Sequence, residues 1–410
     1  MAKRYARDKR DTNPPVKPVE RIELDESHIK RRIVLAVLFA VIGLAAFSFG
    51  IARYRTVDAG WTEVEADAAA DVNLSENFTL YWHLGEGNMT PTAEKKLLTT
   101  VYSEEMTTLW QQFSATQYVE HVNNLYEINR QPNETVQVDP ELFSALKTAV
   151  ELGGRSLYYG PYYEYYNALF LAEDDYSASF FDPEKEPEIA AYFGELAAFI
   201  TDPEHISLEF PAENEVRLHV SEEYLAYIKQ EGIEVLIDLS PAMDAFAADY
   251  TAAKFKEQDL INGCLTSCDG MIASLVPNEE LNFQEYELQG TKIAVKQEMA
   301  YTGARNIVSL RNFPIQEKDA NRFYLYQDGT IVGGYINDQG LQAARFPTLS
   351  AWSEEKSCVE IYYTLMNYFI DNEDAGSAAG NGSGNAQKSS PDLEEIRTAL
   401  EKEGIHLITE

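Results

Sequence analysis

The sequence predicts a mixed α+β domain behind a single N-terminal transmembrane helix. Apolar and polar residues alternate in short segments such as 78–84, which is the pattern of half-buried strands. In longer segments such as 93–115, apolar residues recur at spacings of three to five, which is the pattern of amphipathic helices. Residues 33–52 contain no charged residue, and twenty residues of helix are enough to cross a bilayer.

The basic residues around the apolar segment predict its orientation. Residues 1–32 contain ten Lys or Arg, whereas only Arg53 and Arg55 follow the segment closely. By the positive-inside rule we expect residues 1–32 to be a cytoplasmic basic tail, residues 33–52 to anchor the chain in the cell membrane, and the main domain to be extracytoplasmic. A cleavable signal peptide fits less well, because its apolar core usually has only about 7 to 15 residues.

The charge of the chain excludes one class of partner. The formal net charge is −34, and residues 1–32 contribute +4, which leaves −38 on the remainder. Such an acidic surface repels phosphate backbones, so we expect no nucleic-acid binding. The cysteines Cys264, Cys268 and Cys358 are too few for a disulfide framework. Either of the first two could pair with Cys358, or all three could be buried thiols.

The first half of the domain is expected to follow a tether over residues 53–77. A strand over 78–84 and a helix over 93–115 come first, and a second helix begins at Asp139-Pro140 and ends at Gly153-Gly154. Six tyrosines then fall within nine positions, 158–166. This cluster either lines a ligand cleft or covers the edge of a core, because tyrosine offers a large apolar ring with a polar tip.

The second half of the domain continues to residue 371. Its next expected elements are a hairpin, a short helix and a strand, over residues 206–210 with 216–220, 222–231 and 233–239. Ser240 can then cap a helix that has Pro241 in its first turn. Several strand-like runs and a last helix over about 354–370 complete the domain. Residues 372–389 read as a flexible linker. Residues 390–410 read as a short helix-strand module that either docks on the domain or binds another chain, and docking is expected because the module is too short to fold alone.

Common catalytic motifs are missing. The six histidines are scattered, none lies in a recognisable hydrolase motif, and neither a GxxxxGK loop nor a GxGxxG turn is present. Composition and spacing alone therefore predict an anchored acidic extracytoplasmic domain.

Four stretches resemble the family of FAD:protein FMN transferases (ApbE-like proteins). Residues 112–157 follow the family order of a short "fS", an "lN", a "v.vspeL..ll..Ale" helix and a "tgGaFDpt" turn. The stretch DLSPAMDAFAAD, residues 238–249, aligns without a gap with "DLGGIAKGYAAD". GCLTSCDGMIAS stands where the family has "ALVNLGGDI", and SCVEIYYTLMNYF resembles "ADALATALFVL". The likeness covers roughly residues 78–370 and implies a flavin-transferase-like domain.

The resemblance implies magnesium-dependent transfer of FMN from FAD onto a threonine of a target protein, outside the cytoplasmic membrane. The family's metal ligands carry over to the backbone carbonyl of Met243 and to the side chains of Glu360 and Thr364. A spacing of four puts the last two on one face of a helix, where oxygen ligands suit magnesium. The residues expected to contact FAD are Tyr158, Tyr159, Asp238, Ser240, Asp244, Asp269 and Gly270.

Several positions depart from the family pattern. Ser240-Pro241 replaces a Gly-Gly pair and Asp244 replaces the lysine, so no catalytic residue is assigned. A carboxylate in place of a cation beside the cofactor turns an attraction into a repulsion. At about 4 Å and an effective dielectric near 20, each such charge interaction is worth on the order of 4 kcal/mol before screening. The sequence therefore supports two hypotheses. The chain is either a divergent FMN transferase or a catalytically inactive relative that acts as a cell-surface binding or interaction module. A third, weaker alternative is a metal or sugar binder that uses the acidic surface, but no spaced set of ligands in the sequence supports it.

Overall fold

The computed structural model describes residues 34–35, 37–44, 46–47, 56–67, 74–290, 292–316, 319, 322–371 and 392–409. The chain divides into two compact units, Met1–Val57 and Asp58–Glu410. Residues 34–35, 37–44 and 46–47 of the first unit are helical. Among the described residues, no helix is both long enough and apolar enough to cross a membrane. The rest of the predicted anchor, and the cytoplasmic tail, lie outside the described residues.

A seven-stranded antiparallel sheet forms the centre of the second unit, with the strand order β1-β2-β6-β7-β10-β13-β14. Its strands are β1 (Gly60–Val64), β2 (Phe78–Leu84), β6 (Gly263–Ser267), β7 (Met271–Ser274), β10 (Arg305–Arg311), β13 (Thr348–Ser353) and β14 (His406–Leu407). The predicted strand 78–84 is confirmed. Strand β1 falls inside the predicted tether 53–77, so the folded unit begins before residue 78.

Three smaller sheets surround this one. They contain β3 (Thr135–Gln137) with β5 (Glu215–Val220) and β4 (Ile206–Glu209), the hairpin of β8 (Glu280–Gln289) and β9 (Lys292–Thr302), and β11 (Phe323–Leu325) with β12 (Ile331–Gly333). The predicted hairpin of the segments 206–210 and 216–220 is confirmed, since β4 and β5 pair antiparallel.

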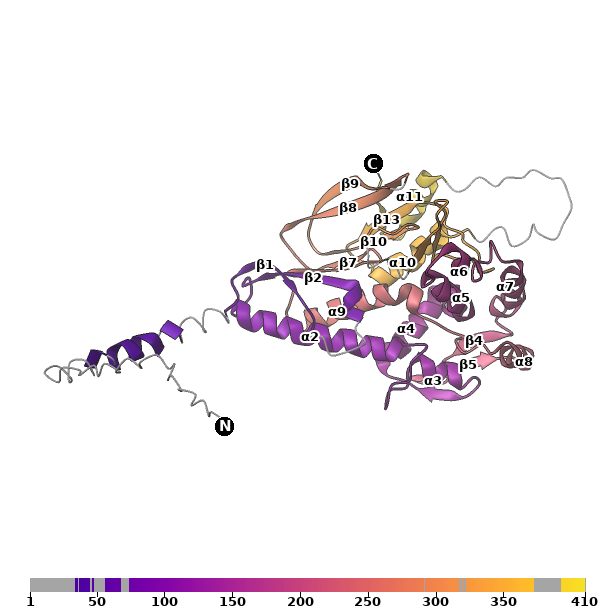
Figure 1. Ribbon diagram of the computed structural model, residues 1–410, viewed down its shortest axis with the longest axis horizontal. Helices are drawn as coiled ribbons and strands as arrows, with labels where there is room; N and C mark the ends of the chain where they lie inside the picture. Colours follow the sequence, from indigo (N-terminus) through magenta and orange to yellow (C-terminus); the bar gives the residue numbers. More distant parts are fainter. Residues whose placement is uncertain are drawn as a thin grey trace, which may run out of the picture. The chain divides into compact units, whose positions relative to one another are not determined.

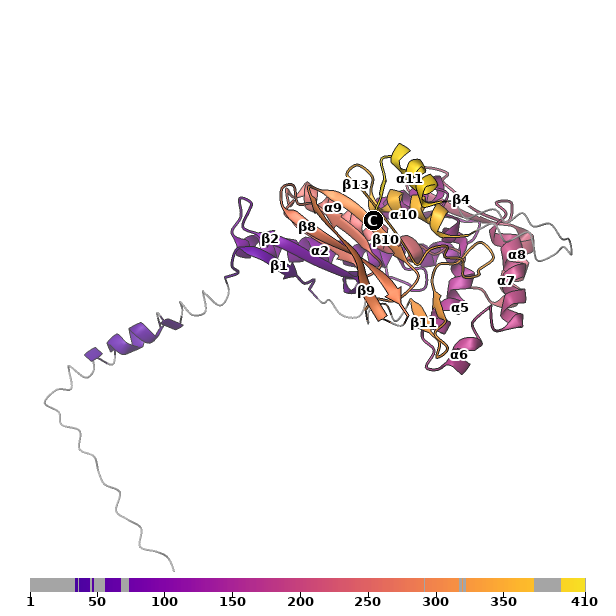
Figure 2. The same ribbon diagram turned by 90° about the horizontal axis from the view of Figure 1, so that it is seen from above.

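Helices α2 (Pro91–Phe113), α9 (Met243–Glu257) and α10 (Cys358–Phe369) pack against the seven-stranded sheet (Figure 1). The remaining helical segments are α3 (Leu125–Arg130), α4 (Pro140–Glu151), α5 (Gly160–Phe170), α6 (Asp175–Ser179), α7 (Pro187–Ile200), α8 (Glu222–Glu231), α11 (Leu393–Lys402) and the 3-10 turns η2 (Leu74–Asn77), η3 (Arg155–Tyr158) and η4 (Ser240–Ala242). Figures 1 and 2 both show α5, α7 and α8 together at the end of the domain away from β1.

The core between the sheet and its helices depends on one glycine. Trp82 is fully buried, its indole lies edge-on to Phe255 at 5.2 Å, and its Nε1 donates to Glu94 at 3.0 Å. A Cβ atom at Gly263, on the neighbouring strand β6, would lie 1.9 Å from the Trp82 ring. Only glycine therefore leaves room for the indole at this position.

The burial of side chains bears on two questions that the sequence left open, the role of the tyrosine cluster and the state of the cysteines. Tyr162, Tyr163 and Tyr166 of the tyrosine cluster are 0%, 9% and 0% exposed, so the face of α5 that they form packs in the core, and Tyr163 also lines a cavity. Their phenol groups donate hydrogen bonds to backbone carbonyls on the loop around residue 338 and on α7. All three cysteines are free and buried.

The C-terminal module docks on the domain, as the sequence predicts. Strand β14 pairs with β13, and Ile408 packs into a cluster with Phe283, Tyr301 and Ile307. The apolar face of α11, with Ile396 at 0% exposed, is buried as well. The module therefore forms the last strand of the large sheet.

Candidate functional site

The site begins at a backbone turn that one asparagine holds. Residues 233–239, predicted as a strand, are not in any sheet, and this prediction is wrong. Instead, the buried side chain of Asn129 accepts hydrogen bonds from the Leu236 and Ile237 N–H groups at 3.1 and 2.9 Å and donates to the Ile237 carbonyl at 3.0 Å. These bonds supply the partners that a neighbouring strand would otherwise provide.

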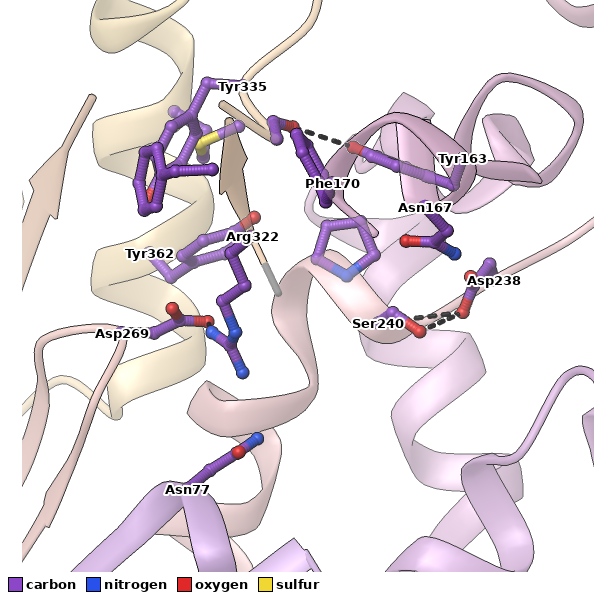
Figure 3. A pocket seen from close by; sticks show the side chains of 14 residues that line it. Asn77, Tyr163, Asn167, Phe170, Asp238, Ser240, Asp269, Arg322, Tyr335 and Tyr362 are labelled. Atoms are coloured by element: carbon purple, nitrogen blue, oxygen red, sulfur yellow. Dashed lines mark hydrogen bonds and ion pairs between the residues drawn. The ribbon is translucent and has the colours of Figure 1, made fainter. Parts of the chain in front are cut away.

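The turn then passes into α9. The Asp238 carboxylate accepts hydrogen bonds from the Ser240 backbone N–H at 2.8 Å and from the Ser240 hydroxyl at 2.6 Å. Burial raises the pKa of Asp238, although the bonds from Ser240 act to lower it. Ser240 and Pro241 lie in the 3-10 turn η4, and α9 starts at Met243. The turn therefore presents Asp238 and Ser240 side by side (Figure 3).

A cavity of about 340 Å³ opens in front of this turn. Its apolar wall consists of five aromatic rings, those of Tyr163, Phe170, Phe323, Tyr335 and Tyr362. Its polar side chains are Asn77, Asn167, Asp238, Ser240, Asp269 and Arg322. A second cavity of about 380 Å³ shares Asn77, Asn167, Asp238 and Ser240 and also contacts Met243. Both volumes lie within the usual range for small-molecule sites.

A guanidinium group and two carboxylates meet at the floor of the first cavity. Arg322 forms an ion pair with Asp269, and its Nη2 lies 3.6 Å from Asp244 Oδ2. Figure 3 shows the Arg322 side chain pointing between Asp269 and Asn77. Asp244 is only 3% exposed, and its Oδ1 accepts a hydrogen bond from the Asn77 amide at 3.2 Å. One positive charge therefore faces two negative charges.

A second, fully buried ion pair holds the segment that brings Arg322 to the cavity. Arg311 Nη2 lies 2.9 Å from Asp319 Oδ2, and the two side chains are 7% and 0% exposed. Asp319 also accepts from the Ile315 backbone N–H at 2.7 Å. The Arg322 backbone N–H donates to the Asp319 carbonyl at 2.9 Å. Sequence analysis did not single out Arg322. The one signal for it was indirect, because a carboxylate at position 244 requires a cation from elsewhere.

The predicted flavin-contacting residues fall into three groups. Asp238, Ser240 and Asp269 line the first cavity, and Asp244 lies below it. Tyr158 and Tyr159 are not among its lining residues: the Tyr158 hydroxyl accepts from the Leu208 N–H at 3.1 Å, and Tyr159 packs on Tyr162.

Gly270 shapes the turn after β6. Its φ of +86° favours glycine, and a Cβ atom there would lie 2.3 Å from the Ser309 carbonyl oxygen. Its role in the structure is therefore to let the turn that bears Asp269 approach β10.

The residues that the resemblance assigns to a metal make other contacts. Glu360 accepts hydrogen bonds from Lys356 Nζ at 2.8 Å and from the Ser357 backbone N–H at 3.0 Å, and with Ser357 it forms the capping box of α10. Burial acts to raise the pKa of Glu360, but these hydrogen bonds lower it overall. Its carboxylate is thus already neutralised by a lysine.

A different face of α10 points into the cavity. Tyr362 and Met366 line it, whereas Glu360 and Thr364 do not. Tyr362 lies two positions after Glu360, and Met366 two positions after Thr364. Two positions correspond to a rotation of about 200° around the helix axis. A phenol and a thioether are poor ligands for magnesium, which prefers carboxylates and water. The residues present at this face do not fit the magnesium site that the resemblance implies, and the location of a metal at Met243, Glu360 and Thr364 stays a prediction.

Comparison with known proteins was made for families, curated proteins and solved structures. No family model and no curated protein matches the chain. Among solved structures, the ApbE protein of Thermotoga maritima is 14% identical and has a TM-score of 0.55, with 85% of this chain and 93% of that chain covered.

Two flavin transferase structures give lower scores. A variant of ApbE from Vibrio cholerae is 15% identical over 76% of this chain and 87% of its own, with a TM-score of 0.49. The apo flavinyl transferase ApbE of Pseudomonas stutzeri is 10% identical over 76% and 84%, with a TM-score of 0.47. At these identities the similarity shows the fold alone. The resemblance found in the sequence is confirmed at that level, and the chain has the fold of the ApbE flavin transferases.

Proposed function

We propose that the chain is a membrane-anchored, extracytoplasmic binding protein that has kept the flavin-transferase fold without the FMN transfer reaction. The observation that carries this proposal is the cluster of Arg322, Asp244 and Asp269 at the cavity floor. The one guanidinium there is already shared between two carboxylates, so it offers little charge to a phosphate.

The effect of these carboxylates on phosphate binding can be estimated from Coulomb's law. A phosphate that approaches Arg322 also approaches Asp244 and Asp269, and Asp238 lies on the other side of the same cavity. Each unit charge at about 4 Å contributes on the order of 4 kcal/mol at an effective dielectric near 20, before screening. Among the described residues at this cavity the carboxylates outnumber the guanidinium, so the net effect on a dinucleotide is repulsive. The aromatic rings favour instead a ligand with a flat apolar body and no excess negative charge.

A divergent FMN transferase is the second candidate. In this case the chain would catalyse magnesium-dependent transfer of FMN from FAD to a threonine of a target protein. The observation that favours it is the position of Asp238, Ser240 and Asp269, three predicted flavin contacts, around one aromatic cavity in a chain with the ApbE fold. The contacts of Glu360 with Lys356 and of α10 with the cavity argue against it, so we derive no catalytic step through the metal.

A titration separates the two candidates. FAD is added to the full chain in detergent micelles, with and without magnesium, and flavin fluorescence and AMP release are followed. We expect no magnesium-dependent saturation at micromolar FAD and no AMP. Magnesium-dependent AMP release that disappears in Glu360→Ala and Thr364→Ala would establish the transferase and refute the first proposal.

The location of the protein is part of the same proposal. Residues 33–52 would anchor it in the cell membrane, with the N-terminus in the cytoplasm and Asp58–Glu410 outside, where a protein target or another surface ligand is the partner. A protease added to intact cells should then digest the main domain and leave an epitope tag at the N-terminus protected. Protection of the main domain would contradict this orientation.

A further inference from the structure

Three potential metal ligands converge below the first cavity. Asp244 lies in the first turn of α9, and Cys268 and Asp269 lie in the turn between β6 and β7. Each offers one oxygen or sulfur atom, and the three atoms lie within 4.8 Å of one another. Two chain segments far apart in sequence therefore bring these side chains to one point.

The turn that carries two of the three ligands is well supported. The Cys268 N–H donates to the Asn77 carbonyl at 2.8 Å, and the Ser267 hydroxyl accepts from the Asp269 N–H at 3.2 Å and from the Met271 N–H at 3.1 Å. These bonds fix the backbone on both sides of Cys268 and Asp269, so little ordering remains to be done when a ligand binds.

The hydrogen bonding of Asp244 is a second, independent observation that points to a cation. Its Oδ2 is buried and receives no hydrogen bond from any described residue. Arg322 Nη2 lies 3.6 Å from this oxygen, which is too long for a hydrogen bond. Arg322 is more closely engaged with Asp269. A buried carboxylate oxygen that accepts no hydrogen bond is costly, and a bound cation at this point would reduce that cost.

We propose that Asp244, Cys268 and Asp269 form a site for a divalent transition metal of the zinc type, and that Arg322 is the counter-ion of these carboxylates in the metal-free protein. Two carboxylate oxygens and one thiolate sulfur suit zinc, whereas calcium and magnesium prefer oxygen ligands alone. Three protein ligands leave a four-coordinate metal one further position for water or for a ligand in the cavity.

Metal binding at this site has a defined proton balance. The Cys268 thiol loses its proton when a metal binds, because the thiolate is the form that coordinates a metal. Binding forms one sulfur–metal bond and releases one proton to solvent. The Arg322 guanidinium keeps its charge and moves away from the carboxylates toward the cavity.

This site is distinct from the one implied by the resemblance, because it uses neither Glu360 nor Thr364. It also does not depend on whether FAD binds, so the FAD titration and the metal experiment can fail separately.

Cobalt(II) is a direct probe, because a cobalt–thiolate bond gives a near-ultraviolet charge-transfer band. Cobalt(II) is titrated into the reduced full chain in detergent micelles, and zinc is then added. We expect the band to form, to disappear when zinc displaces cobalt, and to be absent in Cys268→Ser. Asp244→Asn should weaken binding by about 100-fold or more. The matched controls Cys264→Ser and Asp238→Asn, at a cysteine and a carboxylate outside the ligand set, should keep it.

Arg322→Gln gives the sharpest test. Removing a positive charge about 4 Å from a divalent cation should tighten metal binding at least about tenfold, whereas an anionic ligand of the cavity would bind more weakly to the same variant. If Arg322 only stabilises the loop, the variant unfolds more easily and gains no metal affinity. The proposal is overturned if cobalt gives no thiolate band, if the band persists in Cys268→Ser, or if Arg322→Gln fails to tighten binding. Cys268→Ser is nearly isosteric, so it keeps the test decisive should Asp244→Asn fail to fold.

Discussion

Replacing Asn129 by alanine should destabilise the domain by about 3–5 kcal/mol. The side chain makes hydrogen bonds to the backbone of Leu236 and Ile237 at 2.9–3.1 Å, and all three residues are buried. Alanine would leave two N–H groups and one carbonyl in a region with no neighbouring strand. Each buried, unpaired polar group costs about 1–3 kcal/mol, and partial entry of water reduces the total to the stated range.

The assay is chemical denaturation of residues 56–410, followed by tryptophan fluorescence, with the slope of the transition checked for each variant. Asn123→Ala is the matched control, because this exposed asparagine makes one hydrogen bond, to the Gln137 carbonyl at 2.7 Å. It should cost less than about 1 kcal/mol. A loss for Asn129→Ala no larger than that of the control would refute the view that this side chain replaces a strand.

Three further changes test other parts of the structure. Gly263→Ala places a Cβ atom 1.9 Å from the Trp82 ring and should cost at least about 1–3 kcal/mol in urea unfolding; an unchanged midpoint would contradict the packing. Burial raises the pKa of Asp249 to about 6, so its ionisation destabilises the folded state as pH rises from about 4 to 6. Asp249→Asn should flatten the dependence of the free energy of unfolding on pH, by no more than about 3 kcal/mol. An unaltered dependence would argue against the raised pKa. Ile405→Ala in the docked C-terminal module should cost about 2–4 kcal/mol, whereas Leu393→Ala, 43% exposed, should cost less than about 1 kcal/mol; equal effects would contradict docking.

Much of the fold was predictable from local pattern. The strand 78–84 and the hairpin of 206–210 with 216–220 alternate apolar and polar residues, and this alternation follows directly from one buried face. The segment 233–239 shows the limit of such patterns. Its apolar residues are buried as in a strand, but its backbone partner is an asparagine more than 100 positions away, and no local signal reports that contact.

The site was predictable only in part, for two separate reasons. The spacing of Glu360 and Thr364 correctly puts both on one face of α10, but Tyr362 and Met366 have the same spacing, and spacing does not say which face meets the cavity. Arg322 was missed because its neighbour Asp244 is distant in sequence. Arg322 comes close to Asp244 because the buried ion pair of Arg311 and Asp319 anchors the preceding loop, and only the folded chain reveals this pair.

The charges at the cavity floor form a coupled set rather than a single altered position. The resemblance places a lysine where this chain has Asp244, and the structure shows an arginine from another loop beside that carboxylate. Restoring only the lysine would put two cations side by side next to one remaining carboxylate, Asp269, and would replace an attraction by a repulsion of similar size. Removing only Arg322 would leave the buried Asp244 and the half-buried Asp269 uncompensated unless a metal binds. Neither single change recovers an anion-binding cavity, so the two positions have to change together. This coupling explains how the fold could persist in the binding protein that we propose, in which the charges of the cavity floor no longer favour a phosphate.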